Sequence, residues 1–144
     1  MKIIEKPSLL VTGIIVHANW KQLWNEMPKA WESFFELYES IENKMNSNFM
    51  DISLGIENET YSQLICVEVS EHEAAPEQMI NYVVPLKKYI HHKHTGKLEG
   101  IAESFGKMYT WGKKQKLNTT EFKLDVGYSL SGDENSHDLF IEVV

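Results

Sequence analysis

Apolar and polar positions follow two different periods along the chain. Residues 8–17 are rich in β-branched side chains, which is typical of a strand. Further on, apolar side chains recur every three or four positions, the spacing of a helix face that packs on a core. This stripe consists of Trp31, Phe34, Phe35, Tyr38, Ile41 and Met45. We expect the helix to end in the polar stretch of residues 43–48.

Three further strands are predicted in the middle of the chain. Residues 50–56 and 63–69 have the apolar content of strands and flank a polar turn at residues 57–60. A long strand is predicted over residues 83–94, with Pro85 near its start. Proline lacks an N–H and is tolerated where a strand begins or lies at an edge.

The remainder of the chain repeats this pattern. A second stripe, consisting of Leu98, Ile101, Ala102, Phe105, Met108 and Tyr109, reproduces the helical spacing. Strands follow over residues 121–130 and 137–144, joined by a turn at residues 131–135. The order strand–helix–strand–strand thus occurs twice, over about residues 8–70 and 80–144.

Neither repeat can bury its apolar face alone. We therefore expect a single domain over residues 1–144 with an α+β fold. It would have duplicated β-α-β-β units with antiparallel sheets and helices on one side, packed around a shared core or cleft.

Composition supports an ordinary globular domain. The chain has 144 residues, of which 42% are hydrophobic and 24% are charged. The single Cys66 excludes an internal disulfide, so nothing indicates an oxidising compartment. The apolar stretch of residues 9–16 contains Thr and Gly and is far shorter than the ~20 apolar residues of a membrane span. We expect a cytoplasmic protein that does not bind membranes.

The charge balance disfavours nucleic acid as a partner. Acidic residues outnumber basic ones by 21 to 14, giving a net charge of −7. Proteins that bind nucleic acid need Lys and Arg to displace counterions, and the basic clusters at residues 87–88 and 113–116 are short. The first helical pattern begins only after Asn19, so we expect no helix-turn-helix ahead of the domain. We predict no direct contact with DNA.

Common catalytic motifs are absent from the sequence. It contains no phosphate-binding loop, dinucleotide fingerprint, nucleophile elbow or His-Glu-x-x-His zinc motif. His91, His92 and His94 form a cluster, and His92 and His94 would share one face of a strand as a metal-binding pair can. Because no further ligands are marked, we interpret the cluster as a partly exposed strand end and expect no metal or other cofactor. Cys66 is interpreted as a small buried apolar residue rather than a nucleophile.

Large rings and strand acids are the candidate binding residues. The rings are Trp20, Trp24, Trp31, Trp111, Tyr61, Tyr89, Tyr109 and Tyr128. We expect Trp31 and Tyr89 to lie in the core. Rings with a carboxylate among them can hold a flat or cationic molecule, and each cation–π contact is worth about 0.5–2 kcal/mol. Acids are depleted in strands, which draws attention to Glu68, Glu121 and Asp125. Glu121 and Asp125 share a face, whereas Glu68 can simply face water.

Several short motifs resemble those of the GyrI-like (AraC-type) effector-binding domains. The relevant segments are MPKAW at residues 27–31, APEQM at 75–79, VPLKKYIHHKHTG at 84–96, MYTW at 108–111 and LFIEV at 139–143. They are similar to the family patterns Ile-Pro-x-x-Trp, Pro-x-Gly-Met, Ile-Pro-x-Gly-x-Tyr-x-x-Phe-x-His-x-Gly, Tyr-x-x-Trp and Ile-Tyr-Ile-Pro-Val. Their order and spacing match over nearly the whole chain. The Gly of Pro-x-Gly-Met is replaced by Gln78.

The resemblance implies a duplicated fold with a ligand cleft between the halves. This cleft is lined by aromatic residues, and a strand carboxylate there contacts cationic drugs. Some members of the family follow a DNA-binding region in transcription regulators, and others stand alone, as we expect of this chain. Where the family has Phe-Glu, this chain reads Glu121-Phe122-Lys123-Leu124-Asp125. Either Glu121 or Asp125 supplies the carboxylate, or Lys123 replaces it and changes the preferred charge of the ligand.

We therefore predict a stand-alone module for effector or multidrug binding whose ligand is a small hydrophobic molecule, cationic or neutral. The predicted ligand-binding residues are Trp111, Tyr109, Glu121, Asp125, Trp20, Tyr61 and Glu68. One alternative is a hydrolase that opens strained electrophilic rings with a pocket acid. The other is a gyrase-inhibitor-like regulator that binds a protein through the acidic row Glu32, Glu36, Glu39 and Glu42. We favour binding without turnover.

Overall fold

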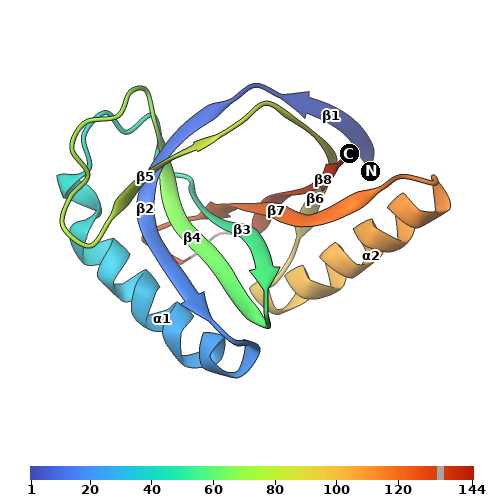
Figure 1. Cartoon of the computed structure of the whole chain (residues 1–144), viewed down its shortest axis with the longest axis horizontal. Coiled ribbons are helices and arrows are strands. Elements are labelled where there is room, and N and C mark those ends of the chain that lie inside the picture. The colour runs from blue at the N-terminus through green and yellow to red at the C-terminus, as the bar shows by residue number, and fades with distance from the viewer. Residues whose placement is uncertain (133–134) are drawn as a thin grey trace.

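The computed structural model describes residues 1–132 and 135–144, so part of the predicted turn at residues 131–135 lies outside the described residues. Within them the chain forms eight strands and two α-helices (Figure 1). In chain order these are β1 (Lys2–Lys6), β2 (Leu9–Ala18), α1 (Trp20–Leu37), β3 (Phe49–Glu57), β4 (Thr60–Val69), β5 (Ile80–Val84), β6 (Lys87–Thr95), α2 (Ile101–Lys114), β7 (Thr119–Tyr128) and β8 (Ser136–Val143).

All the strands join one antiparallel sheet in the order β1-β6-β8-β7-β3-β4-β2-β5. The unit β2-α1-β3-β4 is followed by the equivalent unit β6-α2-β7-β8. The predicted α+β class with duplicated β-α-β-β units is therefore confirmed. The two units share a single sheet, and β3 and β7 pair at its centre.

The strand predicted over residues 83–94 is two strands. β5 ends at Val84 and pairs with β2, whereas β6 begins at Lys87 and pairs with β8. Pro85 cannot donate to a ladder, so the chain leaves one half of the sheet at this residue and enters the other. β1 was not predicted; it pairs along the outer edge of β6.

Helix α1 begins earlier and ends earlier than its stripe suggests. Its start is fixed by a capping box, in which Asn19 accepts a hydrogen bond from the Gln22 amide (2.8 Å) while the Gln22 side chain accepts one from the Asn19 amide (3.1 Å). After Leu37 the chain tightens into a short 3-10 turn, where the Ser40 hydroxyl bonds to the Leu37 carbonyl. Such a bond competes with helix continuation.

Both helices lie on the same face of the sheet, as predicted. α1 packs on β2 and β4 around Phe34, Ile65 and Val67. α2 packs on β6 and β8 around Ile90 and Leu139. No helix among the described residues is both long enough and apolar enough to cross a membrane.

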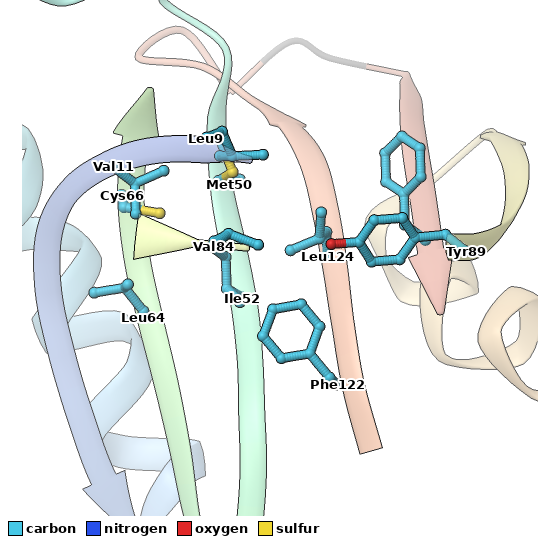
Figure 2. Packing of buried hydrophobic residues seen from close by; sticks show 11 residues of the cluster. Leu9, Val11, Met50, Ile52, Leu64, Cys66, Val84, Tyr89, Phe122 and Leu124 are labelled. Atoms are coloured by element: carbon cyan, nitrogen blue, oxygen red, sulfur yellow. The ribbon is translucent and has the colours of Figure 1, made fainter. Parts of the chain in front are cut away.

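The face away from the helices carries a third apolar cluster, to which both halves contribute (Figure 2). Its buried members include Met50 and Ile52 from β3 and Phe122 and Leu124 from β7. Tyr89 extends its ring into the same cluster. The complete set of its buried residues is Leu9, Val11, Met50, Ile52, Leu64, Cys66, Val84, Tyr89, Phe122, Leu124 and Phe140. Cys66 and Tyr89 are thus core residues, as predicted.

Candidate ligand-binding site between the helices

The central strands β3 and β7 lie between the strands that the two helices cover. Asp51 on β3 pairs with Ile65 of β4, whose side chain packs under α1. Asp125 on β7 pairs with Leu139 of β8, whose side chain packs under α2. Since directly opposed residues share a face, both carboxylates lie on the helix side of the sheet.

Five polar side chains make up this central surface, which we call the inter-helix strip: Asp51, Ser53, Gln63, Lys123 and Asp125. Asp51 is the direct cross-strand partner of Asp125, and Ser53 that of Lys123. The Gln63 amide donates to Asp51 Oδ1 (2.9 Å) and to Ser53 Oγ (3.1 Å). The strip therefore places two carboxylates and one ammonium at the junction of the halves.

Asp51 is an acid whose surroundings disfavour its charged form. Burial, and next the negative charge of Asp125, raise the pKa of Asp51 to about 7. The hydrogen bond from Gln63 and the charge of Lys123 act in the opposite direction and are too weak to cancel the rise. Asp51 consequently exchanges a proton near neutral pH.

Asp125 has stronger partners. Its side chain lies 2.6 Å from His137 Nδ1 through Oδ1, and Oδ2 accepts a 2.6 Å hydrogen bond from the Tyr128 hydroxyl. His137 is fully buried. The Tyr128 ring also lies 4.6 Å from the Trp31 ring on α1. These contacts fix the Asp125 carboxylate and connect the strip to an aromatic cluster on α1.

Lys123 occupies the other side of the strip. Its Nζ lies 5.8 Å from the Phe105 ring centroid and 5.7 Å from that of Tyr109, both on α2. Burial lowers the pKa of Lys123, although the negative charges of Glu121 and Asp51 act against this shift. The Tyr109 hydroxyl donates to the Thr120 carbonyl (2.9 Å). The rings of Phe105 and Tyr109 therefore already interact with a cation of the protein, the Lys123 ammonium.

Some of the residues predicted for the site meet at this strip. Asp125 belongs to it, and Tyr109 contacts its lysine. Glu121 is exposed and close enough to influence the pKa values of Tyr109 and Lys123. Trp111 packs instead against the apolar cluster beneath α2.

Other predicted residues lie elsewhere. Glu68 is on the opposite face of the sheet, where it lines a hollow of about 150 Å³ with Lys6 and Leu124. Trp20 and Tyr61 pair at the start of α1, with ring centroids 5.8 Å apart. Because the sheet separates Glu68 from Asp125, these two acids do not share one site.

Asp51, Gln63 and His137 were not among the predicted site residues. Asp51 could have been found, because it is an acid inside a predicted strand, the same signal that drew attention to Asp125. The positions of Gln63 and His137 depend on strand pairing, which no local pattern reveals.

The histidine cluster has ordinary partners. His94 Nδ1 lies 2.7 Å from the Ser104 hydroxyl and its Nε2 lies 2.8 Å from the Lys97 carbonyl. His91 bonds to Asp138 (2.9 Å) and stacks on Phe140. Across the described part of the chain no three His, Cys, Asp or Glu side chains are grouped as metal ligands.

The sequence profile of Cass2, the integron-associated effector binding protein family, matches residues 2–143. The chain belongs to this family. The GyrI-like resemblance inferred from the motifs is thereby confirmed. Comparison with curated proteins finds no match.

Solved structures share the fold at low sequence identity. SAV2435 bound to tetraphenylphosphonium has a TM-score of 0.77 and 12% identity, covering 99% of this chain and 93% of that one. The integron cassette protein VCH_CASS2 from the mobile metagenome of Vibrio cholerae has a TM-score of 0.72 and 15% identity, covering 99% and 95%. The EcmrR C-terminal domain has a TM-score of 0.72 and 10% identity, covering 99% and 96%. At these identities the likeness establishes the fold.

Proposed function

We propose that this effector-binding protein takes a lipophilic cation at the inter-helix strip. The observation that carries the proposal is the cross-strand pair Asp51 and Asp125, placed between aromatic residues of both helices. Burial makes the charged form of Asp51 costly, and an incoming cation would supply the missing partner while its apolar body contacts the rings. Tetraphenylphosphonium, the ligand of the similar SAV2435 structure, is an ion of this class.

Lys123 acts as an internal competitor in this proposal. A ligand cation would have to replace its ammonium over the rings of Phe105 and Tyr109. Lys123 therefore selects against weakly bound cations, and removing its charge should improve cation binding.

The test compares two ions of the same shape and opposite charge. Calorimetry should show tetraphenylphosphonium binding at least about tenfold more tightly than tetraphenylborate. Asp51→Asn should narrow this preference because the attracting charge is lost. Lys123→Met should widen it because the competing charge is lost while the length of the side chain is kept.

Glu121→Gln is the matched control, since Glu121 is an exposed acid on the same strand. Glu121→Gln should change the preference for tetraphenylphosphonium over tetraphenylborate much less than Asp51→Asn does. Equal binding of the two ions, or a preference that neither Asp51→Asn nor Lys123→Met alters, would contradict the proposal.

A second candidate, acid-assisted opening of a strained ring, is favoured by the proton that Asp51 holds near neutral pH. Asp51 would pass this proton to the ring heteroatom as the carbon–heteroatom bond breaks and water attacks the carbon. The attacking water would then return one of its protons to the Asp51 carboxylate, which restores the acid. Mass spectrometry of styrene oxide incubated with the protein tests this. Diol formation that Asp51→Asn abolishes would support it, and turnover equal to a protein-free sample would exclude it for this substrate.

A further inference from the structure

Two large rings stand exposed at the start of α1, away from the inter-helix strip. Trp20 is 61% exposed and Trp24 is 71% exposed. Exposed apolar surface of this kind often marks a binding site. The capping box of Asn19 and Gln22 fixes the backbone at Trp20, so the position of this ring is set by the fold.

Trp20 forms one wall of a hollow of about 620 Å³. Tyr61 forms another wall, with its ring tilted 50° to that of Trp20 and a centroid distance of 5.8 Å. Ile56, the cross-strand neighbour of Tyr61, also lines the hollow. Two mutually tilted rings thus line one volume, and aromatic cages that bind methylated ammonium groups are built from such rings.

A carboxylate also lines the hollow. Glu59, which lines it, occupies the second position of the two-residue turn between β3 and β4, where Asn58 has φ 51° and Glu59 has φ 65°. A turn with two positive φ values strongly favours Gly at its second position. The chain keeps a charged side chain at a position where it strains the backbone.

We propose that Trp20, Tyr61 and Glu59 form a second binding site for a compact methylated ammonium compound. The rings and the carboxylate match the positive trimethylammonium end. Lys21, which also lines the hollow, matches an oxygen-bearing end, so the ligand class is choline-like. This site does not depend on ligand binding at the inter-helix strip.

Choline and its neutral isostere 3,3-dimethylbutan-1-ol form the decisive pair of probes. In NMR titrations choline should shift the indole N–H signal of Trp20, identified from its loss in Trp20→Leu, and should leave that of Trp111 in place. The neutral alcohol should bind about tenfold more weakly or not at all, because cation–π attraction requires the charge.

Variants locate the site. Trp20→Leu and Tyr61→Leu should each weaken choline binding about tenfold. The matched control on the same helix is Trp24→Leu, because Trp24 lies edge-on to Trp20, with centroids 6.0 Å apart, but does not line the hollow; it should leave choline binding within about twofold. Glu59→Gly should weaken choline binding while raising Tm, since glycine relieves the strained turn. Weaker choline binding together with a higher Tm cannot arise from misfolding. Glu57→Gln, an acid of the same hairpin outside the hollow, is the control for charge.

The proposal is overturned if the neutral alcohol binds as tightly as choline. It is also overturned if Trp24→Leu weakens choline binding as much as Trp20→Leu, or if Glu59→Gly leaves the affinity unchanged. Tetraphenylphosphonium binding is measured separately, so the two sites succeed or fail independently.

Discussion

Asp51 and Asp125 are identical side chains that face each other across two strands and have different partners. Asp125 is held by His137 and Tyr128. Asp51 has the amide of Gln63 and pairs across the strands with another acid. At the residue scale, burial and the negative charge of the cross-strand partner raise the pKa of Asp51 to about 7.

Asp51→Asn should therefore change how stability depends on pH. Folding raises the pKa of Asp51 from 3.8 to about 7, so in that interval the folded protein binds more protons than the unfolded one. Its stability must then fall as pH rises through the interval. Asn imitates the protonated acid, so the variant does not lose this stability as pH rises. The difference in Tm, variant minus wild type, should therefore be more positive at pH 8 than at pH 4.5, by about 3 °C or more.

Thermal scans at the two pH values check this prediction, with Glu42→Gln as the control because Glu42 is exposed. If Asp51→Asn shifts Tm equally at both pH values, burial does not hold the proton on Asp51.

At the element scale, the distinctive feature is a reciprocal exchange of strands. β1 leads into β2 but pairs with β6, and β5 leads into β6 but pairs with β2. Figure 1 shows the two connecting segments passing over the same side of the sheet. Consequently β1, which precedes the first half in the chain, forms the outer strand of the second half. In the same way β5, which precedes the second half, forms the outer strand of the first half.

Deletion of residues 1–6 should expose the second half rather than the first. Loss of β1 leaves the edge of β6, including Lys88 and Ile90, without a neighbouring strand. Amide hydrogen exchange should therefore accelerate in β6 more than in β2. The reciprocal variant Tyr82→Pro breaks the pairing of β5 with Val11 of β2 and should have the opposite pattern. Faster exchange confined to β2 after the deletion would contradict the observed pairing.

At the scale of the whole molecule, the two halves share a core. The cluster opposite the helices contains residues from β3 and β4 as well as β6, β7 and β8. Together with the exchanged strands and the central pairing of β3 with β7, this cluster makes the halves interdependent. We expect one cooperative unfolding transition.

Single-tryptophan variants that keep Trp31 or Trp111 report on the two halves separately, and their urea curves should coincide. Leu124→Ala, in the shared cluster, should lower the free energy of unfolding by about 2–5 kcal/mol and move both curves together. Val83→Ala is the control, because Val83 is half exposed. Two separate midpoints would show that the halves unfold independently.

The sequence alone determined the helices, most strands and the duplication. The helical spacing around Phe34 and Met108 and the β-branched runs of the strands are local properties, since burial of one face imposes its period directly on the chain. The sequence also pointed to Asp125 and Tyr109, because an acid in a strand and rings near it are unusual wherever the strand lies.

The tertiary structure decided which residues meet. β1 and the break at Pro85 could not be assigned from local patterns because they depend on pairing with distant strands. The carboxylate pair of Asp51 and Asp125 exists only because β3 and β7 adjoin in one register, and a shift of one residue between the two strands would place the two acids on opposite faces of the sheet. The same long-range pairing separates Glu68 from the strip, since alternate residues of a strand point to opposite sides of the sheet.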